Sequence, residues 1–440
     1  MSKKKVYFET YGCQMNLNDT EIAGGILKDA GYEITEDINT ADVILLNTCS
    51  VRDNAEQTIL HRLEYLKGHK RRNNKKLIVG IMGCMAERLG ENLIGLENLV
   101  RLVIGPDEYR SLPALLDQAT NKSSGIAIEL STTETYSDII PLRTEGHAAW
   151  LSIMRGCNNF CSYCIVPYTR GRERSKPIKA ILDDLLRLDK NGILEVNLLG
   201  QNVNSYFDKQ AFVKFPELLA QAAEAVPNMR IRFLTSHPYD MSDELIAVMA
   251  KYDNICEYLN LPIQSGSDKI LQLMNRKYTV AHYLERIAKI REAMPDIALS
   301  TDLISGFPSE TEEDHQATLE LLKIVQYDGA YMFNYSPRSG TKSFEMEDDV
   351  DSETKSRRLS EIIHLQNEIA RKKNKLEVGR VHEVLIDGVS KKKKSEWSGR
   401  TKTNKCVIFN NEDGKYKQGD IIHVRITKAN NATLFGEVKE

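Results

Sequence analysis

The sequence lacks the features of a membrane protein and of a disulfide-stabilised secreted protein. It contains no run of 18 apolar residues, so no membrane span is expected. The segment from Met1 to Glu9 is basic but has no apolar core, which argues against a signal peptide. Eight cysteines in 440 residues are too few for a disulfide scaffold. We therefore expect a cytoplasmic protein that makes no use of membranes.

The net charge of the chain is small, but the charged residues are unevenly distributed along it. The formal net charge is −3, yet residues 371–440 hold 17 Lys or Arg against 9 Asp or Glu, which leaves −11 for the rest. The length of 440 residues and the 41% hydrophobic content indicate two to four globular domains. A basic final domain suggests a polyanionic partner at that end, although a solvated lysine surface explains the charge equally well.

The pattern of apolar runs predicts an α/β protein with three domains. We expect an N-terminal Rossmann-like parallel-sheet domain over residues 1–120, a polar connector over 121–145, a partial (β/α)6 TIM-like barrel over 146–375 and a small C-terminal β-barrel over 376–440. Continuous apolar runs such as Val43–Leu46 are typical of strands buried on both faces of a parallel sheet.

Secondary structure can be assigned along most of the chain from the same pattern. The first domain should have strands at 5–10, 42–47, 77–81 and 102–104, and helices at 19–30, 54–67 and 85–89. The second should have strands at 149–154, 195–199, 230–234, 258–261, 298–303 and 329–334, alternating with helices at 178–191, 214–226, 241–252, 266–274, 279–293 and 312–325. A charged helix at 353–377 precedes strands at 380–386, 406–409, 421–427 and 434–438, with turns expected at Asp387-Gly388 and Asp413-Gly414.

Three central cysteines carry the strongest chemical signal. Cys157, Cys161 and Cys164 follow a predicted strand with the spacing Cys-x3-Cys-x2-Cys. Three thiolates on one loop can bind three irons of a cubane cluster and leave the fourth iron open for another ligand. A zinc knuckle is the alternative, but zinc requires four closed ligands and no further Cys or His is close in the sequence. The spacing, the aromatic Tyr163 and the βα series resemble the radical S-adenosylmethionine (SAM) superfamily.

Three further cysteines occupy equivalent places in the first domain. Cys13, Cys49 and Cys84 each follow a predicted strand, and parallel strands end at one edge of a sheet. We therefore predict that the three thiols converge and hold a second cluster. The alternative is three small buried residues, since free cysteine packs as a hydrophobe. Cys256 and Cys406 belong to no such group of cysteines and are expected to be core residues.

Further motifs make the resemblance more specific. The contexts Thr10–Asn16, Asn47–Arg52 and Gly83–Ala86 are similar to the N-terminal domain of the methylthiotransferase family. The resemblance continues through Pro167–Ser175, Gly200–Asn204, Thr235–Pro238 and Leu261–Ser267, so it covers nearly the whole chain. The final segment resembles a TRAM domain, an RNA-binding β-barrel of this family.

The resemblance implies a radical reaction on tRNA. Its implied cofactors are two 4Fe-4S clusters and SAM, with two equivalents used per turnover. One equivalent would methylate a sulfur species at the auxiliary cluster, and the other would yield a 5′-deoxyadenosyl radical at the central cluster. The expected reaction is methylthiolation of carbon 2 of N6-isopentenyladenosine beside the anticodon, at tRNA position 37. The implied partners are the tRNA anticodon stem-loop and a low-potential electron donor, and a monomer suffices.

Polar residues at strand ends are candidates for SAM or adenine contacts, because such positions line barrel sites. These candidates are Tyr163, Gln201, Asn202, Ser236, His237, Gln264, Ser265 and Asp302. Each could equally cap a loop or be a satisfied polar core residue.

Basic residues are candidates for RNA contacts. Arg170, Arg172 and Arg174 alternate after the cluster loop and could clamp RNA from one side, or could pair internally with Glu173 and its neighbours. Lys391, Lys392, Lys393, Lys394, Arg400, Lys402 and Lys405 of the last domain offer sequence-independent phosphate affinity.

Three alternatives to this function stay open. The same chemistry could act on N6-threonylcarbamoyladenosine in tRNA or on an aspartate of a ribosomal protein. A non-catalytic, RNA-binding iron–sulfur protein is a third possibility from another class.

Overall fold

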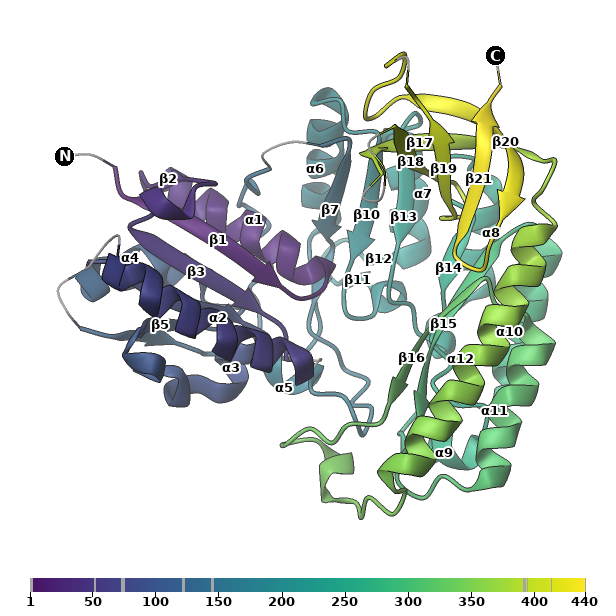
Figure 1. The fold of residues 1–440 in the computed structure, drawn as a ribbon, viewed down its shortest axis with the longest axis horizontal. Helices are drawn as coiled ribbons and strands as arrows, with labels where there is room; N and C mark the ends of the chain where they lie inside the picture. The colour runs from purple at the N-terminus through teal and green to yellow at the C-terminus, as the bar shows by residue number, and fades with distance from the viewer. Residues whose placement is uncertain are drawn as a thin grey trace.

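The computed structural model describes residues 3–50, 53–72, 76–120, 123–143, 146–390, 393, 395–412 and 414–439, with the side chains of 53–56 left out. Figure 1 shows three bodies: an N-terminal sheet domain, a central half-open barrel of strands and helices, and a small β-barrel near the C-terminus. None of the helices in these residues combines the length and apolarity that a membrane span needs.

The N-terminal domain is a six-stranded parallel sheet in the order β2-β1-β3-β4-β5-β6. Its strands are β1 (Lys5–Tyr11), β2 (Glu33–Ile34), β3 (Val43–Thr48), β4 (Ile78–Gly83), β5 (Val100–Ile104) and β6 (Gly125–Ala127). The helices are α1 (Gln14–Asp29), α2 (Asp53–Arg72), α3 (Cys84–Leu89) and α4 (Leu112–Thr120).

The apolar run of β3 is buried on both sides, as its sequence predicts. Val43 and Leu45 pack into one core, under α1 and α4, whereas Ile44 and Leu46 pack into the other, with Leu63 of α2. The sheet also extends into the segment expected to be a polar connector, because β6 pairs in parallel with β5. Helix α1 begins at Gln14, five residues before the predicted start, since Cys13 already serves as its N-cap.

The central domain is a parallel half-barrel made of two three-stranded sheets, β13-β10-β7 and β14-β15-β16. The strands are β7 (Ala148–Ser152), β10 (Glu195–Leu199), β13 (Arg230–Phe233), β14 (Tyr258–Asn260), β15 (Ala298–Ser305) and β16 (Gly329–Asn334). The covering helices are α6 (Ile178–Lys190), α7 (Phe215–Ala225), α8 (Asp243–Lys251), α9 (Asp268–Leu273), α10 (Val280–Ala293), α11 (Glu312–Val325) and α12 (Ser352–Lys375). The predicted (β/α)6 series is therefore confirmed.

The C-terminal domain is a closed barrel in the order β17-β18-β19-β21-β20. Its strands are β17 (Val381–Val389), β18 (Glu396–Thr401), β19 (Cys406–Asn410), β20 (Ile421–Ala429) and β21 (Thr433–Val438). The prediction missed β18, whose Ser398 and Gly399 interrupt any apolar alternation. The turn expected at Asp387-Gly388 is wrong: the register shift there is a bulge inside β17. Asp413 of the other expected turn lies outside the described residues.

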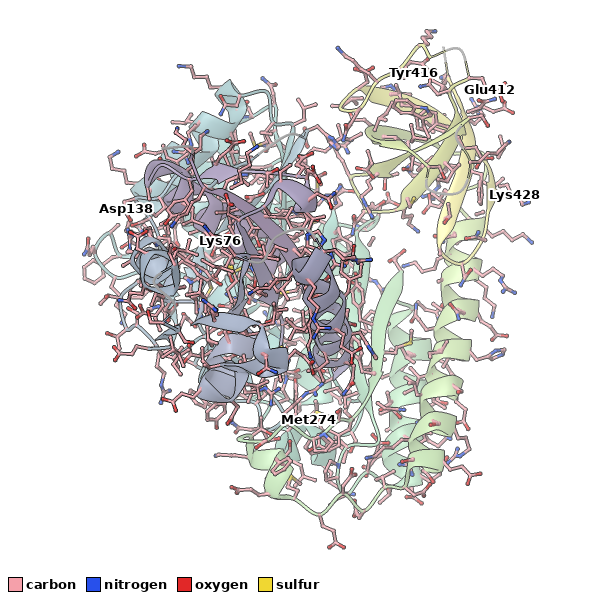
Figure 2. All side chains as sticks on the ribbon, turned by 60° about the vertical axis from the view of Figure 1, so that its left-hand side comes forward. Lys76, Asp138, Met274, Glu412, Tyr416 and Lys428 are labelled. Atoms are coloured by element: carbon pink, nitrogen blue, oxygen red, sulfur yellow. The ribbon has the colours of Figure 1, made fainter. Side chains whose placement is uncertain are left out.

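The small barrel and the cysteine loop lie at opposite ends of the central strands. Arg230 and Arg232, in β13, donate to carbonyls of Arg400 and Thr401 at 2.9 and 2.7 Å, so the small barrel docks near the amino ends. The cysteine loop follows the carboxyl ends, where Ser162 N–H donates to the carbonyl of Met274 at 3.0 Å. In Figure 2, Met274 lies far from Glu412, Tyr416 and Lys428 of the small barrel.

Candidate active site

The three N-terminal cysteines converge at the carboxyl edge of their sheet. Cys13 lies two residues after β1 and caps α1, while Cys49 and Cys84 directly follow β3 and β4, and these three strands are neighbours in the sheet. The strand order changes direction between β1 and β3, and open α/β sheets bind ligands at such a switch point. Hydrogen bonding with Cys49 and the charge of Arg170 outweigh burial and hold the pKa of Cys13 at about 6. A thiol that ionises readily suits metal ligation.

Two asparagines build the frame around Cys13. Asn16 Oδ1 accepts hydrogen bonds from the Cys13 backbone N–H at 3.2 Å and from its thiol at 3.4 Å. Asn16 Nδ2 donates to Asn47 Oδ1 at 2.9 Å, and Asn47 Nδ2 returns a bond to the carbonyl of Asn16 at 2.8 Å. Both side chains are fully buried. A Cβ at Gly83, whose φ is +91°, would lie 2.5 Å from Asn47 Oδ1, so only glycine fits there.

The central cysteines lie on a loop held between two short antiparallel strands, β8 (Met154–Arg155) and β9 (Arg174–Ser175). Gly156, with φ +76°, starts the loop, and a Cβ there would lie 2.1 Å from the carbonyl oxygen of Arg172. Its N–H donates to Gln201 Oε1 at 2.5 Å, and Cys157 N–H donates to the carbonyl of Gly171 at 3.2 Å. Burial raises the pKa of Cys157 to about 11.

Three thiols on this short loop are the donor set that an iron–sulfur cluster requires. Burial and the neighbouring thiol of Cys161 raise the pKa of Cys164 to about 12, so the metal must displace its proton on binding. The positive charge of Arg276 lies beside the loop, with Nη1 donating to Cys161 Sγ at 3.3 Å. The loop therefore fits a cluster with three thiolate ligands.

Arg276 contacts the cysteine loop, although the sequence analysis did not select it. Its guanidinium also donates to the carbonyl of Pro262 at 2.8 Å and to the hydroxyl of Tyr278 at 2.7 Å. These bonds fix the guanidinium between the cysteine loop and the end of β14. The segment Met274–Lys277 carries no motif that could have revealed this role, because the contact joins residues 115 positions apart.

The strand-end candidates lie at the same end of the barrel. They differ in whether their polar atoms are already hydrogen-bonded within the protein. Asn202 donates to Asp240 at 2.7 Å, while its Oδ1 and the hydroxyl of Ser236 are buried with no partner among the described residues. Ser265 Oγ instead accepts from the N–H of Ser267 at 3.2 Å, so its bond is internal. Asn202 and Ser236 are thus the stronger candidates for ligand contacts.

The other candidates have defined surroundings. Burial and the charges of Arg276 and Lys277 lower the pKa of His237 to about 2, so the imidazole is neutral. Burial raises the pKa of Asp302, against the opposing effects of Asn260 and Arg276. Gln264 has φ +74° and exchanges backbone bonds with the β15 segment. Tyr163 packs against a small apolar cluster that includes Phe307 and Tyr335.

Five buried charges join the two cysteine sites. Arg155 Nη1 donates to Asp19 Oδ1 at 2.9 Å, and Arg170 Nη2 donates to Asp19 Oδ2 at 2.7 Å. Arg174 Nη2 contacts both oxygens of Asp107, at 2.8 and 2.9 Å. Burial alone would raise the pKa of Asp19, but Arg155 and Arg170 outweigh it and hold the pKa below its usual value. The arginines come from the cysteine-loop region and the aspartates from the N-terminal domain.

This network corrects the RNA-contact prediction for Arg170 and Arg174. Both side chains are buried and form ion pairs across the domain boundary, so they cannot contact phosphates; their partners are Asp19 and Asp107 rather than Glu173. Arg172 is exposed, with its guanidinium 4.2 Å from the centroid of the Phe160 ring. Of the three, only Arg172 stays available to RNA.

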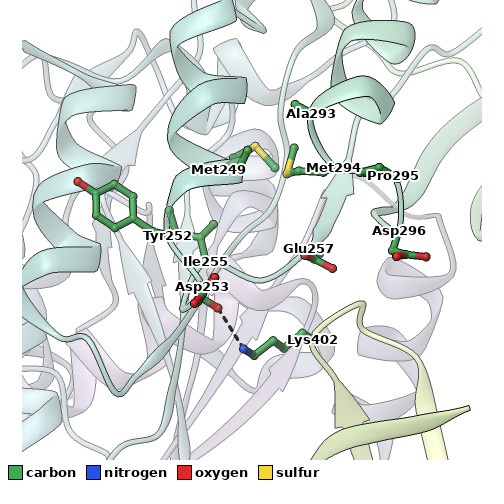
Figure 3. Close-up of a pocket in the computed structure, with 11 residues that line it drawn as sticks. Met249, Tyr252, Asp253, Ile255, Glu257, Ala293, Met294, Pro295, Asp296 and Lys402 are labelled. Atoms are coloured by element: carbon green, nitrogen blue, oxygen red, sulfur yellow. Dashed lines mark hydrogen bonds between the residues drawn. The ribbon is translucent and has the colours of Figure 1, made fainter.

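The basic residues of the small barrel also include both internally bonded and exposed side chains. Lys405 is wrong as an RNA contact, because it is largely buried and paired with Asp328 at 3.1 Å and Glu377 at 3.4 Å. Lys402 donates to the carbonyl of Asp253 at 3.1 Å beside a cavity of about 220 Å³ at the domain junction (Figure 3), away from the cysteines. Lys393 and Arg400 are exposed. Lys391, Lys392 and Lys394 lie outside the described residues.

Family models match three successive parts of the chain. Residues 5–105 match the uncharacterized protein family UPF0004, residues 151–322 the radical SAM superfamily and residues 375–439 the TRAM domain. Among solved structures, the radical SAM methyltransferase TsrM from Kitasatospora setae has a TM-score of 0.57 at 14% identity, covering 76% of this chain and 75% of that chain. The cobalamin-dependent radical SAM enzyme OxsB has a TM-score of 0.52 at 12% identity, covering 83% and 56%. The fold and the cysteine loop thus define a radical SAM enzyme.

Relatives with closely similar sequences narrow this class. The tRNA-2-methylthio-N(6)-dimethylallyladenosine synthases of Phocaeicola vulgatus and Chloroherpeton thalassium are each 53% identical to this chain, covering 99% of it and 96% of the relative. That of Porphyromonas gingivalis is also 53% identical, over 100% of the chain and 96% of the relative. The chain belongs to the family of tRNA-2-methylthio-N(6)-dimethylallyladenosine synthases.

Proposed function

We propose that this protein methylthiolates carbon 2 of N6-isopentenyladenosine, also called dimethylallyladenosine, at position 37 of tRNA. The observation that carries the proposal is the physical link between the two cysteine sites. Arg170 contacts Cys84 of the N-terminal triad, and the carbonyl of the next residue, Gly171, accepts from Cys157 of the central triad. Two sites that act on one substrate atom must lie close together. Here two consecutive residues, Arg170 and Gly171, connect the two triads. The product in the names of the relatives is the same.

The cofactors would supply the radical and the methylthio group, and the chain supplies ligands and surroundings. We assign one 4Fe-4S cluster to Cys13, Cys49 and Cys84, and the other to Cys157, Cys161 and Cys164. An arginine donates to one thiol of each triad: Arg170 to Cys84 and Arg276 to Cys161. Such hydrogen bonds and charges are the means by which a protein tunes a cluster.

Substrate would bind at the carboxyl ends of the barrel strands. Asn202 Oδ1, which has no partner in the described parts of the chain, can accept from an amino group, and the hydroxyl of Ser236 can donate or accept. Neutral His237 lies edge-on to Tyr278, with ring centroids 5.4 Å apart, at the same strand ends. An adenine unstacked from an anticodon loop costs less to insert here than one from a duplex.

RNA would contact two separate surfaces. Arg172 lies beside the cysteine loop, whereas Lys393 and Arg400 belong to the small barrel at the other end of the central strands. We infer that the small barrel binds phosphates of the stem while the anticodon loop enters at the carboxyl ends. The proposal further includes a low-potential electron donor, a monomeric enzyme and a cytoplasmic site of action.

Anaerobic turnover tests the proposal. The reconstituted protein is mixed with reductant, SAM and tRNA that carries isopentenyladenosine, and nucleosides are analysed by mass. Gain of a methylthio group should be abolished by Cys13→Ala and by Cys157→Ala, but not by Cys256→Ala, which replaces a buried cysteine outside both triads. Release of 5′-deoxyadenosine without any change in this tRNA would reject the proposed substrate, and tRNA with threonylcarbamoyladenosine would be tried next.

A further inference from the structure

We propose that Arg170 is a positioning residue for the N-terminal cluster: it fixes Cys84 through Nε and offers Nη1 to a small anionic sulfur group bound beside the triad. This inference rests on the proposed function, which assigns a cluster to Cys13, Cys49 and Cys84. It adds a role for a side chain that comes from the other domain and follows the radical-cluster loop.

The guanidinium is held from two sides, through Nε and Nη2, and one of its three nitrogens is left without a bond in the part of the chain that the structure describes. Nε donates to Cys84 Sγ at 3.1 Å, and Nη2 donates to Asp19 Oδ2 at 2.7 Å. The side chain is only 3% exposed, and Nη1 has no hydrogen-bond partner among the residues that the structure describes. The guanidinium also interacts electrostatically with Cys13. A buried charged donor without a partner is costly, so Nη1 would be stabilised by a ligand in the functional state.

Charge supports the same assignment. The buried network contains three arginines and two aspartates: Arg155, Arg170 and Arg174 with Asp19 and Asp107. It therefore carries one surplus positive charge at a place where water cannot screen it. That positive charge would offset part of the negative charge that three thiolates and an anionic sulfur group bring to the site. A hydrosulfide or an alkanethiolate has the size and sign that Nη1 requires, and a charged donor bonds such an acceptor strongly.

Arg155 provides an internal comparison. It binds the other oxygen of Asp19 and donates to the carbonyl of Pro106 at 2.9 Å, but no contact with a cysteine is recorded for it in the described part of the chain. A role limited to joining the domains would make the two arginines equivalent. A role at the cluster distinguishes Arg170 from Arg155, because of these two described residues Arg170 alone donates to a thiol of the N-terminal triad.

The experiment isolates the N-terminal cluster. Cys157→Ala, Cys161→Ala and Cys164→Ala are combined in the full chain, so that any remaining cluster signal belongs to the N-terminal triad. Into this parent we introduce Arg170→Gln, Arg170→Lys or Arg155→Gln. Two quantities are measured anaerobically: the reduction potential by redox titration with electron paramagnetic resonance, and the affinity for methanethiolate from the spectral change on titration.

We expect Arg170→Gln to lower the potential and to weaken methanethiolate binding by about 10-fold or more, the usual effect of losing a partner of a metal ligand. Arg170→Lys keeps the charge but not the fork of donors, so its potential should stay nearer that of the parent while the affinity still falls. Arg155→Gln should retain most of the affinity.

Equal potentials and affinities in the parent and both Arg170 variants would overturn the inference, as would equal losses in Arg155→Gln and Arg170→Gln. If Arg170→Gln cannot retain iron, Arg170→Lys decides, and unchanged methanethiolate affinity in that variant would also overturn it. A parent that shows no cluster at all would instead refute the second cluster of the proposed function.

Discussion

Arg170 donates from Nε to Sγ of Cys84 at 3.1 Å, across the boundary between the central and N-terminal domains. The two residues are 86 positions apart in the chain. Because Gly171, the next residue, holds the backbone of Cys157, the contact fixes one cysteine triad relative to the other. A reaction that uses both sites needs this fixed separation.

The two triads should hold iron independently. Replacing Cys157, Cys161 and Cys164 by Ala should halve the iron and sulfide of the reconstituted protein, because the N-terminal triad lies on a separate sheet edge. Replacing Cys13, Cys49 and Cys84 should halve them as well. Cys256→Ala should retain the full content, measured by iron and sulfide analysis. Complete loss of iron in either triple variant would contradict independent sites.

Arg276 should matter for SAM cleavage. Arg276→Gln removes the donor to Cys161 Sγ, and the rate of 5′-deoxyadenosine formation should fall about 10- to 100-fold, as is common when a partner of a metal ligand is lost. Lys277→Gln is the matched control, since it removes the same charge from the exposed neighbouring position. Equal rates in the two variants would show that only the local charge matters.

Glu87 should make stability depend on pH. Burial, together with Asp107 and Glu108, raises its pKa to about 8 in the folded protein from an ordinary value near 4.5. The folded state then binds more protons between these two pH values, so stability falls as pH rises through that window.

Glu87→Gln removes this dependence. The free energy of unfolding of the variant should therefore exceed that of the unmodified protein by an amount that grows from pH 5 to pH 9. Since Glu87 is only partly buried, we expect a gain of about 1 kcal/mol at pH 9, seen as a rise of a few degrees in the thermal midpoint. The exposed Glu91→Gln should show no such trend. A constant difference across the pH range would contradict the assignment.

Arg400 and Lys405 should behave oppositely although both lie in the small barrel. Arg400→Ala should weaken anticodon stem-loop binding and reduce the slope of log affinity against log salt by about 1. Lys405→Met should leave that slope unchanged and lower the thermal midpoint, because Asp328 and Glu377 lose a buried partner. Fluorescence anisotropy across a salt series and thermal unfolding distinguish the two effects. A reduced slope in Lys405→Met would reject its structural role.

The local sequence pattern was sufficient to predict secondary structure where the chain repeats the strand–helix unit. The strands predicted at 195–199 and 329–334 coincide with β10 and β16, because their buried runs are bounded by clear helix and turn signals. Local pattern failed at β18, which is largely polar, and at β6, which has only three residues, because such strands form only where a neighbouring strand pairs with them. The start of α1 was missed since cysteine is an unusual N-cap.

Spacing and the geometry of parallel sheets were enough to predict the domain order, the cysteine loop and the positions of three further cysteines at strand ends. The contacts of the arginines are visible only in the folded chain. Arg170 and Arg174 look like surface phosphate contacts in the sequence, yet they are buried against Asp19 and Asp107. The reason is that a buried charge is tolerated only beside an opposite one, and the partners here are 151 and 67 residues away. No local pattern records a pairing of that range.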